Sequence, residues 1–155
     1  VFGELHDSDI SWMMQAGKME SIAANQVLLN MGRPVDALYT VLDGELAIST
    51  TATPCDPFST SSHGLAERSS QQDFQPLACL SRGGLPGIIS FMDFQTLPVR
   101  IHALRDTRLL SIPRQTMMIK LQEDVGFAAR FYRVIATQAV QLLTSMMAAE
   151  CKPAM

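Results

Sequence analysis

The spacing of apolar residues changes at Pro113, and this change limits the folds that the chain can adopt. Before Pro113 the apolar residues form short β-rich runs at regular spacing, which is typical of an antiparallel sandwich or barrel. After Pro113 they recur every three or four residues, as in amphipathic helices. The sequence therefore predicts a mainly β fold with flanking helices. We expect an antiparallel β-roll of about eight short strands (a jelly roll, or double-stranded β-helix), framed by an N-terminal helix and two C-terminal helices.

Capping and turn residues divide the β-rich part. Asp7-Ser8-Asp9 can cap a first helix over about residues 8–16, which Gly17 ends. Asp43-Gly44 lies between two β-rich runs and predicts a two-residue β-hairpin, because both turn positions need positive φ. The expected strands are residues 26–30, 38–42, 45–49, 74–80, 88–92, 99–103 and 108–112.

A single domain accounts for the whole chain of 155 residues. We expect an N-terminal helical segment over 1–25, the β-roll over 26–112 and the C-terminal helices over 113–150. Residues 50–75 interrupt the β-roll with a Ser/Thr-rich stretch that has no periodicity. We interpret it as a long surface loop, and as a tolerated insertion in preference to a lid over a ligand site.

Composition excludes several classes of protein. A net charge of −3 argues against nucleic-acid binding by this chain alone, since phosphate binding needs a basic patch. No apolar run is long enough to span a membrane, and the start has no signal-peptide pattern. The three cysteines, Cys55, Cys79 and Cys151, share no C-x-x-C spacing, so we expect free thiols and a cytoplasmic protein.

The sequence holds no pattern typical of an enzyme. His6, His63 and His102 are scattered singly, which argues against a metal site. The nucleophile, P-loop and metalloprotease motifs do not occur. We therefore expect no catalytic residues, no metal and no cofactor.

The second C-terminal helix, expected over about residues 125–149, is apolar around much of its circumference. One face can cover the sheet, and the remainder calls for a partner helix. We predict a homodimer through this helix; a domain downstream of this sequence is the alternative cover. The candidate interface residues are Phe131, Ile135, Ala139, Leu142 and Met146.

Glycines cluster ahead of the apolar run that begins at Ile88. Clustered glycines let a backbone turn sharply and present bare N–H groups, which is how many proteins receive an anion. An alternating strand with Val99, Ile101 and Ala103 on one face follows. This segment is the candidate ligand site of the chain.

The order of these elements and their motifs resembles the cyclic nucleotide-binding domain, as in catabolite activator proteins and the regulatory subunit of protein kinase A. The resemblance covers nearly the whole chain. The matching motifs are Gly32-x-Pro34-x-x-x-Leu38-Tyr39-x-Val41-x-x-Gly44-Glu45, Gly84-x-x-Gly87, Ile101-His102-Ala103 and Leu110-x-Ile112-Pro113-Arg114.

The resemblance implies a ligand-binding cassette in which backbone N–H groups and an Arg neutralise the cyclic phosphate and a Glu takes the ribose 2′-hydroxyl. In this sequence Ile88 stands at the Glu position and Leu97 at the Arg position. Arg100 is the nearest substitute, but its odd offset places it on the other face of a regular strand. The candidate cassette residues are Gly84, Gly87, Ile88, Ile89, Ser90, Leu97 and Arg100.

Two functions remain open. In the first, the domain no longer binds cyclic nucleotide in the family manner and acts through its C-terminal helix in signalling or transcriptional regulation. In the second, it senses a small ligand or a cyclic nucleotide (cAMP or cGMP) in an altered binding mode. The loss of both charged contacts favours the first, because a buried phosphate without a paired cation is costly.

Overall fold

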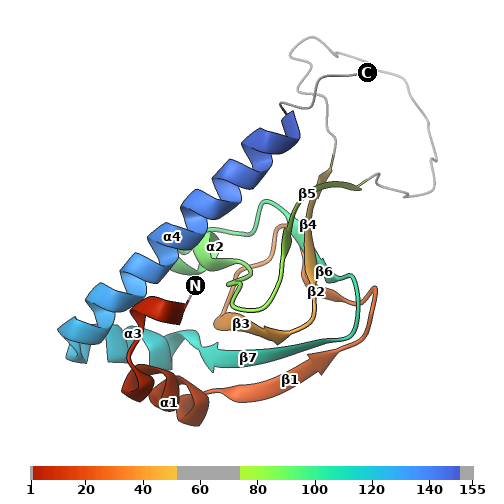
Figure 1. The fold of residues 1–155 in the computed structure, drawn as a ribbon. Helices are drawn as coiled ribbons and strands as arrows, with labels where there is room; N and C mark the ends of the chain where they lie inside the picture. The colour runs from red at the N-terminus through yellow and green to blue at the C-terminus, as the bar shows by residue number, and fades with distance from the viewer. Residues whose placement is uncertain (1, 52–73, 151–155) are drawn as a thin grey trace, which may run out of the picture.

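The computed structural model describes residues 2–51 and 74–150, which fold into two antiparallel sheets with helices along one side (Figure 1). The described strands are β1 (Lys18–Ile22), β2 (Val27–Leu29), β3 (Ala37–Asp43), β4 (Leu46–Thr51), β5 (Phe74–Leu80), β6 (Arg100–Ala103) and β7 (Thr107–Pro113). One sheet has the order β1-β7-β3 and the other has the order β2-β6-β4-β5.

The helices of the described residues frame these sheets as the sequence predicted. A 3-10 turn (Phe2–Glu4) and α1 (Asp7–Ala16) precede the strands, and α3 (Arg114–Glu123) and α4 (Val125–Glu150) follow them. Figure 1 shows α4 running along one side of the molecule, with α1 and α3 beside its N-terminal half. The mainly β fold with an N-terminal helix and two C-terminal helices is thus confirmed. No helix in the described parts of the chain is long and apolar enough to cross a membrane.

The predicted hairpin at Asp43-Gly44 is wrong. β3 pairs with β7 in one sheet, whereas β4 pairs with β5 and β6 in the other, so this turn carries the chain between sheets. Gly44 alone of the two has positive φ, at 117°. A Cβ on Gly44 would lie 2.6 Å from the Cα of Thr107, which leaves room only for glycine. The local Asp-Gly pattern identifies a turn but does not encode which strand each arm pairs with.

The strand predicted over residues 88–92 is also wrong, because this segment is the short helix α2 (Ile88–Asp93). Gly87 precedes it with a φ of 74°, and the amide of Phe91 donates to the carbonyl oxygen of Gly87 at 3.0 Å. Buried Ile88 and Phe91 are three residues apart, as on one face of a helix. Ser90 is also buried, and it lies two residues after Ile88, as on one face of a strand. The burial of so short a run therefore fits both a helix and a strand.

β1 was missed, and it lies within the segment expected to be helical. Its side chains are exposed or half-buried, and within the described part of the chain it pairs only with β7, at the edge of its sheet. A strand without a buried face has no alternation of apolar and polar residues, which explains why the sequence did not predict β1. The described residues form seven strands, and residues 52–73 of the predicted long loop lie outside them.

Candidate ligand-binding site

A cavity of about 200 Å³ lies between the β2-β6-β4-β5 sheet, the α2 segment and α4. The β-roll, the α2 segment and the α4 helix all contribute to its wall. The lining residues are Ile48, Leu77, Leu80, Leu85, Gly87, Ile88, Ile89, Ser90, Leu97, Pro98, Val99, Ile101, Gln138, Ala139, Leu142 and Met146.

The cavity brings together most of the predicted cassette. Gly87, Ile88, Ile89, Ser90 and Leu97 line it, although the side chain of Ile89 is largely exposed to solvent. A Cβ on Gly87 would come within 2.8 Å of Cδ1 of Leu29, so this glycine also permits close packing under the α2 segment.

Gly84 and Arg100 are not among the residues that line this cavity. Gly84 borders a neighbouring, more polar hollow, and its amide donates to the carbonyl oxygen of Ser81 at 2.9 Å. The amide of Gly83 donates to the carbonyl oxygen of Val41 at 2.8 Å. These two N–H groups of the glycine cluster are therefore used within the chain.

No charged side chain is among the residues found to line the cavity. Ile88 and Leu97 are buried and belong to the hydrophobic core. On β6, Ile101 lines the cavity whereas its neighbour Arg100 does not. The electrostatic environment is thus that of a protein interior rather than that of an anion site.

Gln138 is the polar residue of this wall that the sequence did not reveal. Its side chain lies on α4, is only 5% exposed, and borders both the apolar cavity and the polar hollow. Among the described residues, its Oε1 has no hydrogen-bond partner. This oxygen is fully enclosed by protein atoms, so it is not part of the cavity surface. A glutamine amid apolar residues of α4 was the one available signal.

Arg114, the first residue of α3, attaches α2 to the helices that follow. Its Nη1 donates to the carbonyl oxygen of Phe91 at 2.7 Å, and Nε donates to that of Val35 at 3.1 Å. Its guanidinium carbon also lies 4.8 Å and 4.4 Å from the ring centroids of Phe91 and Phe94. The sequence placed Arg114 in a family motif without predicting this role.

α4 packs its predicted interface stripe against its own domain. Phe131 is 1% exposed and stacks on Phe127, so it is not available to a second chain. Ala139, Leu142 and Met146 line the cavity, and Ile135 packs against the core. The apolar side chains that α4 exposes are instead Val125, Tyr132, Val140, Leu143 and Met147.

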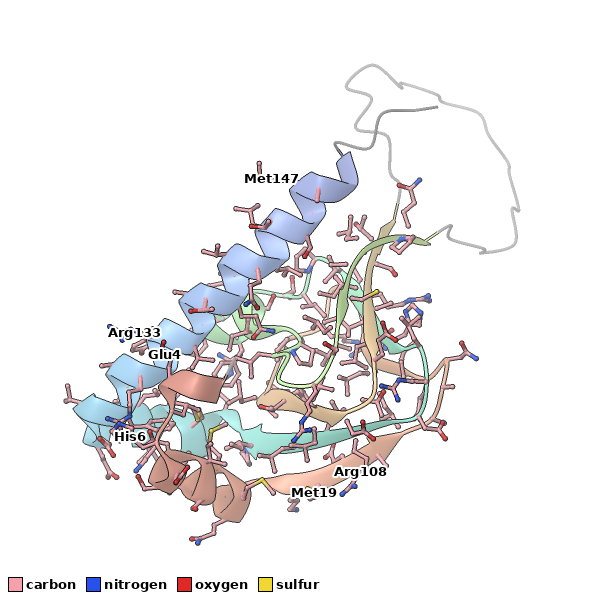
Figure 2. All side chains as sticks on the ribbon, in the orientation of Figure 1. Glu4, His6, Met19, Arg108, Arg133 and Met147 are labelled. Atoms are coloured by element: carbon pink, nitrogen blue, oxygen red, sulfur yellow. The ribbon has the colours of Figure 1, made fainter. Side chains whose placement is uncertain are left out.

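A buried ion pair fixes the N-terminal half of α4. Nε and Nη2 of Arg130 donate to the two carboxylate oxygens of Asp9 at 2.7 and 2.9 Å. Asp9 is 4% exposed, and the hydrogen bonds from Arg130 hold the pKa of this carboxyl below its usual range, against the opposing effect of burial. Figure 2 shows Glu4 beside Arg133, the second ion pair between α4 and the N-terminal segment.

No group of His, Cys, Asp and Glu in the described parts of the chain could hold a metal ion. His102 lies on β6, where burial first and the neighbouring charge of Arg100 second lower its pKa. Cys79 is a free, exposed thiol, whereas His63, Cys55 and Cys151 lie outside the described residues.

Comparison with known proteins identifies the class to which this fold and site belong. Residues 19–124 match the family model of the cyclic nucleotide-binding domain. The chain therefore belongs to this family, as its motifs predicted.

Two curated proteins are similar to this chain in sequence. The chain is 25% identical over 132 residues to lysophospholipase nte1 of Emericella nidulans, which covers 85% of this chain and 8% of that protein. It is 26% identical over 122 residues to lysophospholipase nte1 of Aspergillus oryzae, covering 79% of this chain and 7% of that protein. The chain thus spans less than a tenth of either relative.

Solved structures share the fold. The catabolite activator protein of Thermus thermophilus superposes with a TM-score of 0.68 at 17% identity, covering 96% of this chain and 62% of that one. The c-di-GMP responsive global regulator CLP of Xanthomonas campestris gives 0.73 at 14% identity, covering 92% and 61%. The regulatory domain of Toxoplasma gondii PKA, crystallised with cAMP, gives 0.58 at 17% identity, covering 76% and 38%.

Proposed function

We propose that this chain is a regulatory domain that does not bind cyclic nucleotide in the family manner and that acts through α4 in signalling or transcriptional regulation. The observation that carries the proposal is the apolar lining of the cavity beside α2, where Ile88 and Leu97 are buried. A cyclic nucleotide placed there would lose the hydration of its phosphate without gaining a cation for that phosphate. It would also find no carboxylate for the ribose hydroxyl. The energetic cost of burying that charge is the reason we expect the usual ligand to be rejected.

The packing of α4 supports its role as the output element. Its N-terminal half is held by buried Phe127, Phe131 and Val134 and by the Asp9–Arg130 pair. Beyond Gln138, its inward contacts come from the half-buried Leu142 and Met146, which cover the cavity. The C-terminal half is therefore held less firmly, and a change in the cavity would act on it first.

The curated relatives fit a regulatory rather than a catalytic role for this segment. Both are named lysophospholipases, and the matching segment makes up 8% and 7% of them. A domain of this share within an enzyme is suited to controlling activity that resides elsewhere in the chain. We therefore infer that the domain works as part of a larger protein, with its partner surface on α4.

Titration calorimetry with cAMP and with cGMP tests the proposal. We expect no heat of binding for either nucleotide at protein concentrations of roughly 100 µM, because the cavity offers no partner for the phosphate. The Arg100→Ala variant is the matched control and should behave as the wild type does. Micromolar cAMP affinity that Arg100→Ala abolishes would overturn the proposal and make the chain a sensor with an altered binding mode.

A further inference from the structure

We propose that Gln138 destabilises the contact between the C-terminal half of α4 and the β-roll, so that this half can leave the β-roll while the N-terminal half stays in place. The inference rests on the proposed function in taking α4 as the output element, and it names the residue that sets how firmly this element is docked. Three observations carry it: the enclosed and unpaired amide oxygen of Gln138, the firm packing of α4 before this residue, and the weaker packing after it.

The amide oxygen of Gln138 loses its hydration when α4 packs on the β-roll. The residue is 5% exposed, and its Oε1 is fully enclosed without a hydrogen-bond partner among the described residues. A polar atom that gives up water without gaining a donor opposes the docked position. When this part of the helix moves away from the β-roll, water reaches the oxygen again and the cost disappears.

The N-terminal half of α4 has contacts that hold it in place. Phe127, Phe131 and Val134 are fully buried and belong to the hydrophobic core. The ion pair of Arg130 with buried Asp9 joins the same half to α1. Movement that begins at Gln138 is therefore confined to the residues that follow it.

The C-terminal half of α4 has weaker contacts with the β-roll. Among the described residues, Leu142 and Met146 are its larger inward-facing apolar side chains, and both are only half-buried. They cover the cavity of about 200 Å³, so they lack some of the van der Waals contacts that a close-packed interior supplies. The docked and undocked positions therefore lie close in free energy, and a partner that contacts only one of them shifts the balance.

Hydrogen-exchange mass spectrometry tests this inference on the wild type and on Gln138→Met. Methionine is similar to glutamine in size and in helix propensity but has no amide group to hydrate. In the wild type, we expect the backbone amides of residues 142–148 to exchange faster than those of residues 127–134. In Gln138→Met, the amides of residues 142–148 should exchange about 5- to 100-fold more slowly, the effect of removing one unpaired buried polar group.

Gln141→Met is the matched control, because it makes the same substitution at an exposed position of the same helix. It should leave the exchange of residues 142–148 unchanged. Both variants keep the exposed apolar side chains of α4, so self-association through that face would affect all three proteins alike. Circular dichroism confirms that each variant is folded.

The outcomes also separate this inference from the proposed function. Unchanged or faster exchange in Gln138→Met would overturn the role of Gln138, and so would equal exchange rates in the two halves of wild-type α4. These experiments contain no nucleotide, so such a failure leaves the rejection of cyclic nucleotide standing. Conversely, cAMP binding in calorimetry would overturn the proposed function, while slower exchange in Gln138→Met would still support the effect of Gln138 on docking.

Discussion

At the scale of single residues, the buried carboxylate of Asp9 contributes to the stability of the fold. It is buried, it accepts two hydrogen bonds from Arg130, and its Oδ2 also accepts the amide of His6 at 2.9 Å. Asp9→Asn would leave the guanidinium against a neutral amide. We expect a loss of roughly 2 to 3 kcal/mol in the free energy of unfolding, below the full cost of breaking a deeply buried pair because Arg130 reaches solvent.

Urea denaturation measures this loss, and Glu4→Gln provides the control. Glu4 also pairs with an arginine of α4, Arg133, at 3.3 Å, but both side chains are largely exposed. An exposed pair contributes little, so Glu4→Gln should cost less than about 0.5 kcal/mol. Equal effects of the two variants would mean that burial does not strengthen the Asp9 pair.

The lowered pKa of Asp9 gives the same pair a pH dependence. Between the pKa of the folded protein and the ordinary value of 3.8, the unfolded chain binds the proton and the folded chain does not. Stability therefore rises with pH across this window, and the contribution of the ionised carboxyl is complete above it. The difference between wild type and Asp9→Asn should be full at pH 6 and should shrink as the pH falls below about 4. A difference that stays constant would contradict the assigned pKa direction.

At the scale of elements, Arg114 joins the site to the C-terminal helices. Arg114→Lys keeps the charge but loses the planar fork that reaches the carbonyl oxygens of Phe91 and Val35. We expect a destabilisation of roughly 1 to 3 kcal/mol and faster hydrogen exchange at the amides of α2. Hydrogen-exchange mass spectrometry checks this, with Arg108→Lys on the exposed side of β7 as the control. Unchanged exchange in α2 would contradict the link.

The elements also show what the sequence could predict. Asp9 and Asp124 accept backbone N–H groups at the starts of α1 and α4, and Pro113 directly precedes α3, so the positions of these helices were predicted closely. β1 has no buried face, and α2 is too short for its apolar residues to distinguish the helix period from the strand period. The partners of β3 and β4 depend on how the strands wind between sheets, which the Asp43-Gly44 turn cannot encode.

The candidate site was predictable in part for the same reasons. Family motifs located the cassette segment, and Gly87, Ile88 and Leu97 do line one cavity. The place of Gln138 in the cavity wall depends on the fold, because α4 meets the α2 segment only after the chain has wound through both sheets. Likewise, the apolar stripe of α4 was visible, but which side faces the β-roll is decided by packing of Phe127 and Phe131.

At the scale of the whole molecule, α4 leaves an apolar surface without cover in the described residues. Its exposed apolar side chains, together with Ala129 and Ala136, fall within about 80° of arc on one side of the helix. Figure 2 shows Met147 projecting from α4 away from the sheets. The interface proposed from the sequence therefore moves to the neighbouring face: Val125, Tyr132, Val140, Leu143 and Met147.

We predict that this face forms a homodimer in which α4 packs against its copy. Leu143 is 59% exposed, and Ala136 allows close approach of a second helix. Light scattering at micromolar concentration should give twice the chain mass of 17.0 kDa, and Leu143→Glu should return it to a monomer by placing a charge in an apolar contact. Met19→Glu, which alters another exposed apolar side chain, on β1, should leave the dimer intact. A monomeric wild type would mean that another segment or protein covers α4, because burial of such a face is favourable at about 25 cal/mol per Å².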